Sequence, residues 1–243
     1  MNQENLVEAT FKNSKIRVLQ DKSEFCFGID AVLIAHFASS KKGKTVFDLG
    51  TGTGIIPLLM TKLDEDSRFT ALEVQERSAE IARLNVENNN LQERIAVLQA
   101  DIKDVKKTFA AECADIVVSN PPYAKMNPVK KNPNEAKNIA RHEILCNLDD
   151  VVSAASWLLK TGGSFFMIHR PERLSEIFAA FSKAHLEAKK LQLVLPFADS
   201  SPTMIMIEAK KNARPDLKIL APLVMYKQKG EYTDSIKEIY KNF

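Results

Sequence analysis

Short apolar runs alternate with longer amphipathic stretches along most of the chain. The apolar runs have the length and β-branched content of buried strands, and they lie at 45–49, 68–74, 95–100, 114–118 and 164–168. The stretches between them repeat apolar residues at helical spacing, at 55–62, 77–90, 151–159 and 172–185. This alternation predicts an α/β fold with a mostly parallel sheet and helices on both of its faces.

The pattern changes toward the end of the chain. Two apolar runs, at 191–195 and 204–209, follow each other without a helical stretch, which predicts an antiparallel pair at the sheet edge. Residues 234–240 have the pattern of a closing helix. We therefore expect a single domain of residues 1–243. Its parts are an N-terminal extension at 1–44, a core at 45–212 and a tail at 213–243 packed on the core.

Three glycines, Gly50, Gly52 and Gly54, stand between the first predicted strand and the first predicted helix. Glycines this close together indicate a backbone that turns sharply and approaches a ligand. A nicotinamide-binding loop would have its third glycine at Ile55, and a Walker phosphate loop would continue with Gly-Lys-Ser or Gly-Lys-Thr. The segment from Asp48 to Gly54 instead resembles the cofactor loop of Rossmann-like, class I methyltransferases that use S-adenosylmethionine.

That resemblance implies a seven-stranded sheet with an antiparallel edge pair, and a cofactor site at the strand ends. Asp48 and the backbone of 50–54 would hold the amino-acid end of the cofactor. Glu73 would accept hydrogen bonds from two ribose hydroxyls, with Val74 beside the adenine. Asp101 and Ile102 stand where this superfamily binds the adenine amine.

The tetrapeptide Asn120-Pro-Pro-Tyr123 directly follows the predicted strand at 114–118. An exocyclic amine on an aromatic ring is a weak nucleophile with two hydrogens that can be held. The Asn120 side-chain oxygen and the Pro121 carbonyl can accept both, while Tyr123 stacks on the base. Two prolines, Pro121 and Pro122, fix an extended turn that directs carbonyls outward. The pattern favours a catalytic site for a planar nitrogen substrate, and a plain strand-ending turn is the alternative.

Composition limits the classes of function. No apolar stretch approaches the roughly 20 residues that span a bilayer, and the N-terminus has no signal-peptide pattern, so we expect a cytoplasmic protein. The three cysteines and four histidines show no metal-ligand spacing, so we expect no metal. The net charge of +3 is too small to prove a nucleic-acid partner.

Basic residues nevertheless gather after the Asn-Pro-Pro-Tyr turn. Residues 121–145 hold five basic residues against two acidic ones, and the segment 169–173 adds a second basic cluster at another strand end. Such clusters can bind phosphates, although on charge alone an ordinary solvated loop explains the first cluster equally well. The expected RNA contacts are Lys125, Lys130, Lys131, Arg141, Arg170 and Arg173.

Several segments narrow the resemblance to one group of enzymes. They are Phe27–Ala35, Asn120–Tyr123, Ala140–Glu143, His169–Leu174, Pro222–Tyr226 and Glu231–Thr233. Together they resemble the bacterial family that methylates the N6 amine of the adenosine next to the anticodon in a valine tRNA, over nearly the whole chain.

This narrower resemblance implies a tRNA partner, S-adenosylmethionine as cofactor, and no membrane contact; we expect a monomer. It implies that Asp30 lies near the methionine end of the cofactor, and a helix N-cap is the alternative role for Asp30. The expected cofactor residues are Asp30, Asp48, Gly50, Thr51, Gly52, Thr53, Gly54, Glu73, Val74, Asp101, Ile102 and Asn120.

Three alternatives remain open. The same turn occurs in enzymes that methylate guanine in ribosomal RNA, adenine in DNA, or a glutamine side chain of release factors. A non-catalytic nucleic-acid-binding protein would keep the fold, but intact Asp48, Glu73, Asp101 and Asn120 argue against it. A nicotinamide oxidoreductase is disfavoured by the glycine spacing.

Overall fold

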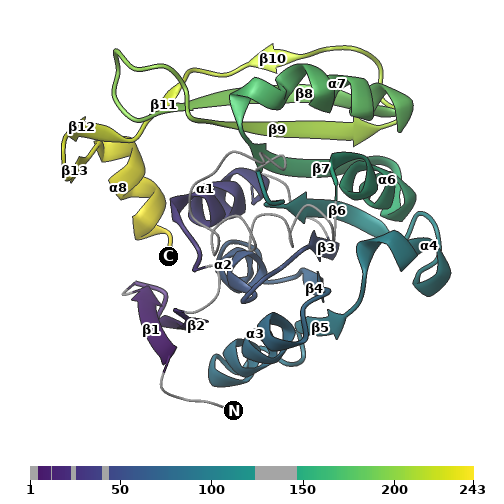
Figure 1. Ribbon diagram of the computed structural model, residues 1–243, viewed down its shortest axis with the longest axis horizontal. Coiled ribbons are helices and arrows are strands. Elements are labelled where there is room, and N and C mark those ends of the chain that lie inside the picture. The colour runs from purple at the N-terminus through teal and green to yellow at the C-terminus, as the bar shows by residue number, and fades with distance from the viewer. Residues whose placement is uncertain (1–4, 12, 23–25, 40–43, 124–146) are drawn as a thin grey trace, which may run out of the picture.

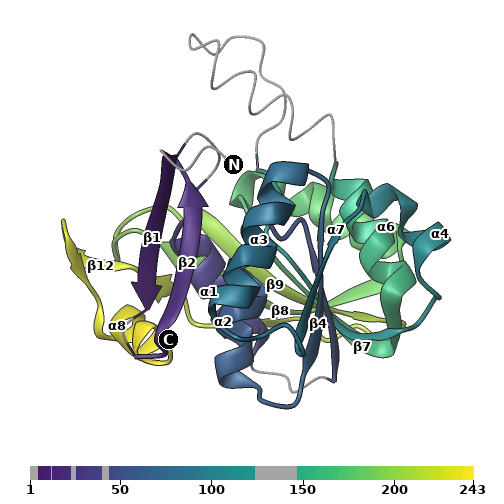
Figure 2. The ribbon, with the colours of Figure 1, turned by 90° about the horizontal axis from the view of Figure 1, so that it is seen from below.

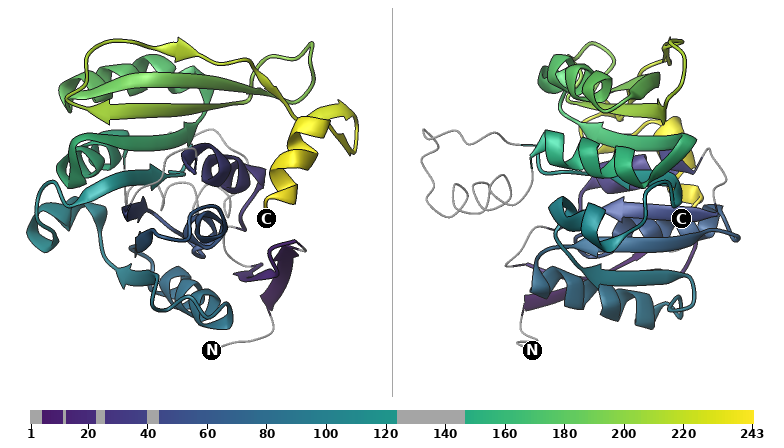
Figure 3. Two further views of the ribbon diagram at one scale, coloured as in Figure 1. Left: turned by 180° about the vertical axis from the view of Figure 1, so that it is seen from behind. Right: turned by 90° about the vertical axis from the view of Figure 1, so that its right-hand side faces the viewer.

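The computed structural model of the protein describes residues 5–11, 13–22, 26–39, 44–123 and 147–243. Within these ranges nine strands form the central sheet, in the order β10-β8-β9-β7-β6-β3-β4-β5, with β11 also paired to β8. The long strands are β3 (Thr45–Leu49), β4 (Arg68–Glu73), β5 (Ile95–Gln99), β6 (Ala114–Ser119), β7 (Leu159–His169), β8 (Leu186–Leu195) and β9 (Met204–Lys211). Figures 1 and 3 show β10 at one edge of the sheet and β5 at the other.

Helices cover both faces of this sheet, as the alternating pattern predicts. One face packs against α1 (Ile29–Ala38), α2 (Ile55–Leu63) and α8 (Asp234–Lys241), through residues such as Val46, Ile116 and Phe166. The other face packs against α4 (Val105–Thr108), α6 (Leu148–Leu158) and α7 (Leu174–Lys183), through Phe47 and Phe165. Because successive side chains of a strand point to opposite faces, neighbouring residues such as Phe165 and Phe166 enter different cores. Helix α3 (Glu76–Asn88) contacts β4 and β5.

The strand order reverses at β3. The chain runs from β3 outward to β4 and β5, then returns to pair β6 on the other side of β3, with β7 beyond it. These pairings are all parallel, so the carboxyl ends of β3, β4, β5 and β6 share one edge. A reversal of this kind opens a crevice at that edge, which is where open α/β sheets bind ligands.

The predicted seven-stranded sheet is wrong in its strand count. The seven strands from β3 to β9 are present, and β9 is antiparallel to both β7 and β8. The C-terminal tail adds β10 (Lys218–Ile219) and β11 (Leu223–Val224), both parallel to β8. These two-residue strands give hydrogen-bond partners to a ten-residue strand that would otherwise lie bare at the edge. They are too short to have a periodicity that the sequence could display.

Helix α6 ends one residue before the end of the helical stretch predicted at 151–159, although a helix-stopping Gly162-Gly163 pair follows only later. Its last residue is Leu158, and Leu159–His169 form one long strand in which Gly162 has a φ of 81°. The glycines interrupt the regular pairing of β7 with β6, which shifts register between Ala114 and Ile116. The glycine pair therefore marks an irregular stretch of strand rather than the helix end.

The N-terminal and C-terminal parts of the described chain pack against each other. Strands β1 (Leu6–Phe11) and β2 (Ile16–Asp21) form an antiparallel hairpin that the sequence analysis did not predict. The Phe11 ring packs against Tyr240 in α8 and Phe243 just after it, and the Asn13 amide donates to the Lys241 carbonyl at 3.0 Å. Figure 2 shows the hairpin beside α8. Two small strands, β12 (Tyr226–Gln228) and β13 (Glu231–Tyr232), precede that helix.

None of the helices in the described ranges has both the length and the apolar character needed to cross a membrane.

Candidate active site

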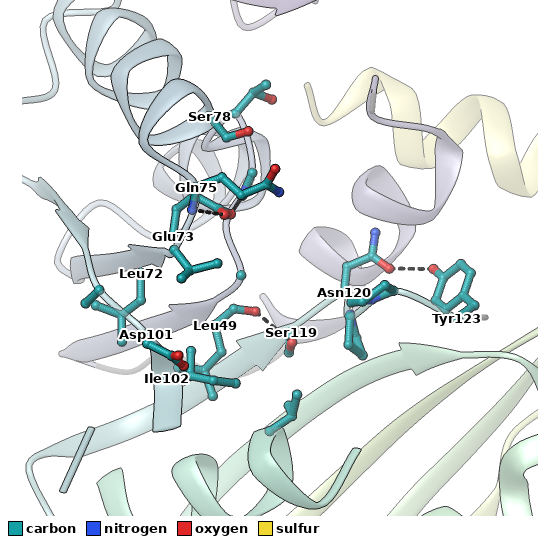
Figure 4. A pocket seen from close by; sticks show the side chains of 18 of the residues that line it. Leu49, Leu72, Glu73, Gln75, Ser78, Asp101, Ile102, Ser119, Asn120 and Tyr123 are labelled. Carbon is teal, nitrogen blue, oxygen red and sulfur yellow. Dashed lines mark hydrogen bonds between the residues drawn. The ribbon is translucent and has the colours of Figure 1, made fainter. Parts of the chain in front are cut away.

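A cavity of about 400 Å³ opens at the carboxyl edge of the sheet, where the strand order reverses. Its wall is built from the ends of β3, β4 and β6, the first turns of α1 and α3, and the start of the short helix η2 (Ile102–Asp104). The predicted residues that line it are Asp30, Gly50, Gly52, Thr53, Glu73, Val74, Asp101, Ile102, Asn120, Pro121, Pro122, Tyr123 and Arg170. Figure 4 shows several of these side chains around the cavity. One cavity thus brings together the predicted cofactor and catalytic residues.

Backbone conformation explains the glycines at the end of β3. Gly50 has a φ of 75° and Gly52 a φ of 57°, in the left-handed region that side-chain-bearing residues rarely adopt. A Cβ atom at either position would meet nothing within 4 Å. The turn therefore needs glycine for its conformation, and the space beside it stays open to a ligand. Gly54 caps α2 and does not line the cavity.

Glu73 holds the glycine loop in position. One oxygen of its carboxylate accepts a hydrogen bond from the Gly52 amide at 2.9 Å, and the other accepts from the Gln75 amide at 2.9 Å. The side chain lies at the end of β4, is largely buried and lines the cavity. Each carboxylate oxygen has a second lone pair, so Glu73 can still accept hydroxyl hydrogen bonds from a ligand.

Asp48 lies behind the cavity rather than in its wall. The residue is fully buried, and within the described ranges neither carboxylate oxygen makes a hydrogen bond of ordinary geometry. The pKa of Asp48 is raised to about 7: burial is the largest cause, the nearby Thr51 hydroxyl works against it, and the charge of Glu73 adds to it. Thr51 is also outside the cavity wall. Asp48 and Thr51 therefore do not line the cavity that Glu73 and Asp101 line.

This raised pKa gives a testable pH dependence. Between about pH 4 and 7 the folded protein keeps the Asp48 proton that the unfolded chain loses, so this residue makes the protein less stable as pH rises. Asp48→Asn cannot titrate and removes that slope. We expect the free energy of unfolding of the variant, relative to wild type, to rise by at least about 1 kcal/mol from pH 4.5 to 7.5 in urea titrations. Parallel curves for the two proteins would contradict the assignment.

Asp101 caps η2 at the end of β5. Its side chain accepts a hydrogen bond from the Lys103 amide at 2.9 Å and pairs with the Lys103 ammonium at 3.3 Å. The side chain remains 27% exposed and lines the cavity beside Ile102. Asp101 therefore keeps an accessible carboxylate at the edge of the space that Glu73 also borders.

The Asn120-Pro-Pro-Tyr123 turn follows β6, on the other side of the glycine loop. The Ser119 hydroxyl donates to the Leu49 carbonyl at 2.8 Å, which joins the ends of β3 and β6. The Asn120 amide nitrogen donates to Asp30 Oδ2 at 3.1 Å, and the Tyr123 hydroxyl donates to the same oxygen at 2.8 Å. The Tyr123 hydroxyl also contacts Asn120 Oδ1, as Figure 4 shows.

Asp30 is not the N-cap of its helix. Gly28 occupies that position and makes no side-chain cap, and Asp30 lies one residue inside α1. Its other carboxylate oxygen accepts from the Ala31 amide at 3.0 Å. The side chain is buried and lines the cavity. The alternative role of Asp30 as an N-cap is therefore wrong.

Of the two predicted basic clusters, the structure describes the basic residues of the second one. Arg170 lines the cavity, donates to the Thr203 carbonyl at 3.0 Å, and lies over the Tyr123 ring at 5.1 Å from its centroid. Arg173 pairs with Glu176 at 3.0 Å. His169 beside them is buried, and burial together with the positive charge of Arg173 lowers its pKa to about 4. The predicted contacts Lys125, Lys130, Lys131 and Arg141 lie outside the described residues.

The sequence patterns did not identify some of the residues that line the cavity. They include Asp21, Leu49, Leu72, Gln75, Ser78 and Ser119. Leu49 and Leu72 are register partners at the carboxyl ends of β3 and β4, so the strand assignments contained a signal for them. Asp21 comes from the unpredicted hairpin and pairs with Arg77 at 3.0 Å. No local pattern could have identified it.

The fold and the sequence are both similar to those of known methyltransferases. A solved structure from Agrobacterium tumefaciens, described as a predicted O-methyltransferase, superposes with a TM-score of 0.72 at 24% identity, covering 88% of this chain and 96% of that one. A tRNA1(Val) (adenine(37)-N6)-methyltransferase from Bacteroides thetaiotaomicron is 26% identical over 95% of this chain and 96% of its own length. Its namesake from Haemophilus influenzae is 27% identical over 96% of this chain and 97% of its own. The sequence profile of the methyltransferase small domain matches residues 27–192, so the chain belongs to that family.

Proposed function

We propose that this protein transfers a methyl group from S-adenosylmethionine to the N6 amine of an adenosine in tRNA, the adenosine next to the anticodon of a valine tRNA. The observation that carries this proposal is the position of Asn120 and Pro121 in the wall of the cavity that also contains the glycine loop, Glu73 and Asp101. Relatives of that name match nearly the whole chain, including the ends outside the shared family domain.

The cavity fits the proposed methyl donor. Its volume of about 400 Å³ lies within the range of small-molecule sites. The carboxylates of Glu73 and Asp101 are hydrogen-bond acceptors suited to ribose hydroxyls and an adenine amine. In the glycine loop after β3, the Thr53 hydroxyl is buried and makes no hydrogen bond within the described residues. A buried polar group without a partner is costly, so the loop has bonding capacity left for a ligand.

The mechanism requires alignment more than acid–base chemistry. Bound S-adenosylmethionine supplies a methyl carbon made electrophilic by its positively charged sulfur. Asn120 Oδ1 and the Pro121 carbonyl accept the two hydrogens of the target amine and fix the direction of its lone pair. As the nitrogen becomes positive, the same two oxygens stabilise the developing charge. The proton can leave afterwards to water, so no strong base is needed.

An adenosine in an anticodon loop is a suitable substrate for the Asn120–Tyr123 turn, which lies in the cavity wall. A base must leave its stack to reach Asn120, and in an anticodon loop it is already partly unpaired, which lowers that cost. In this proposal Lys125, Lys130, Lys131, Arg141, Arg170 and Arg173 contact the RNA, and Tyr123 turns to stack on the base. Residues 1–243 act as one domain, as a monomer and in the cytoplasm.

The experiment that tests this function compares defined substrates. Purified protein is incubated with labelled S-adenosylmethionine and a valine tRNA transcript, and the nucleosides are analysed by mass spectrometry. We expect N6-methyladenosine, and none when that adenosine is replaced by guanosine. Ribosomal RNA, DNA and a release factor are tested in parallel. Methylation of one of these but not of the tRNA would contradict the proposal and identify the alternative.

A further inference from the structure

We infer that Asp30 is a positioning residue for methyl transfer: its carboxylate turns the Asn120 side chain so that Oδ1 faces the target amine. This inference rests on the proposed function and goes beyond it, because it assigns Asp30 a role toward Asn120 instead of toward the methyl donor. The two residues are ninety positions apart, on α1 and after β6, and the fold brings them to one wall of the cavity.

The oxygen and nitrogen of an asparagine side chain are nearly equal in shape, so only hydrogen-bond partners decide which one faces a ligand. An ionised carboxylate accepts hydrogen bonds and cannot donate them. Asp30 Oδ2 lies 3.1 Å from the Asn120 nitrogen, so this contact is satisfied only when the NH₂ group faces Asp30. Oδ1 then faces away from the carboxylate.

The orientation matters because the target is itself a donor. An amine that meets Asn120 Oδ1 makes a hydrogen bond, whereas an amine that meets the NH₂ group faces another donor. Without Asp30 the Asn120 side chain would present Oδ1 to the amine in some molecules and its NH₂ group in others. Only the orientation with Oδ1 toward the amine allows the reaction. Asp30 is well suited to this task because the Ala31 amide holds its other oxygen at 3.0 Å and the residue is buried.

Tyr123 strengthens the arrangement. Its hydroxyl donates to the same Asp30 oxygen at 2.8 Å and contacts Asn120 Oδ1. A hydroxyl has one hydrogen, so it serves only one of these acceptors at a time. When Tyr123 turns to stack on a base, its hydroxyl leaves Asn120 Oδ1, and the Asp30 contact alone keeps that oxygen directed at the amine.

The decisive experiment is a double-mutant cycle between Asp30→Asn and Asn120→Ala. We expect Asp30→Asn to lower kcat about tenfold or more, because a hydrogen bond to a charged group has about that effect. In the Asn120→Ala background the same change should cost less than about threefold, because Asp30 acts through Asn120. Additive losses would overturn the inference. The exposed Asp216 provides the control Asp216→Asn, which should leave kcat unchanged.

Two further measurements separate the possible roles of Asp30. The dissociation constant of S-adenosylhomocysteine, measured by calorimetry, should change less than about threefold in Asp30→Asn if the carboxylate acts on Asn120. A large loss of affinity with kcat preserved at saturating donor would assign Asp30 to the donor and overturn the inference.

Gly28→Ala is an independent probe, since a Cβ there would lie 2.8 Å from Asp30 Oδ1 and displace the carboxylate. Gly28→Ala should lower kcat, as Asp30→Asn does.

One readout does not depend on tRNA at all. The Asn120 side-chain amide hydrogens, followed by NMR in the wild-type protein and in Asp30→Asn, should exchange with solvent faster in the variant. If the wild-type protein methylates no tRNA, the proposed function fails while this measurement still decides the role of Asp30. Equal exchange rates in the two folded proteins would overturn the inference even if tRNA is methylated.

Discussion

Asn120→Ala should lower kcat for tRNA methylation by about 100-fold or more, which is the scale of losing one hydrogen-bond partner used in a transition state. The substitution removes Oδ1, the acceptor that fixes the amine and stabilises its developing charge. It leaves the glycine loop intact, and Glu73 and Asp101 lie on the other side of the cavity from Asn120. Donor binding should therefore persist.

The measurement combines single-turnover kinetics with an S-adenosylhomocysteine titration. Asn242→Ala, at an exposed position after α8, provides a matched control that should keep wild-type kinetics. Thermal melting checks that Asn120→Ala folds. Near-normal turnover in a folded Asn120→Ala protein would refute the role assigned to Asn120. Loss of both turnover and donor affinity would mean that the residue acts on the donor first.

The core of the fold could be predicted because its signals are local. The run at 45–49, the three glycines and the helix starting at Ile55 each follow from neighbouring residues, and the structure confirms β3, the turn and α2. The C-terminal pair at 204–209 and 191–195 is likewise confirmed as β9 and part of β8. Helix 234–240 corresponds to α8, whose Thr233 side chain accepts from the Ile236 amide as an N-cap.

Features that depend on distant contacts could not be predicted. Strand β2 of the hairpin has a short alternating pattern in which Ile16 and Val18 are buried. This pattern is too short to predict a strand by itself, and the hairpin is held by a distant contact, in which the Leu19 amide donates to the Asn85 side chain. The Asn85 amide also donates to the Thr53 carbonyl at 2.9 Å, so one side chain ties the hairpin to the glycine loop. Strands β10 and β11 exist only because β8 offers an edge.

The site shows the same division. Glu73, Asp101 and Asn120 were identified by their positions at strand ends, and the cavity contains all three. Asp48 belongs to the same motif, yet its side chain is buried behind the glycine loop. A motif gives the order of residues along the chain, whereas the direction of each side chain depends on the alternation of the strand. The contact between Asp30 and Asn120 required the three-dimensional structure, because nothing in either segment indicates the other.

Glu73 connects the loop to the ligand space, and its removal should give the largest loss of donor affinity. In Glu73→Ala the amides of Gly52 and Gln75 lose their acceptor, and the proposed ribose ligand is lost as well. Hydrogen bonds to a carboxylate contribute about 1.5–3 kcal/mol each. We therefore expect the dissociation constant for S-adenosylhomocysteine to rise by about 100-fold or more, by calorimetry.

Glu73→Gln separates the two contributions of this carboxylate. Glutamine keeps one acceptor oxygen but presents an NH₂ group to the second backbone amide, so one of the two loop contacts must break. Its affinity for the donor should lie between those of wild type and Glu73→Ala. If both variants bind the donor as wild type does while tRNA methylation falls, the carboxylate serves the RNA side of the reaction. The ribose assignment would then be wrong, and the donor would have to bind through Asp101 and the glycine loop without Glu73.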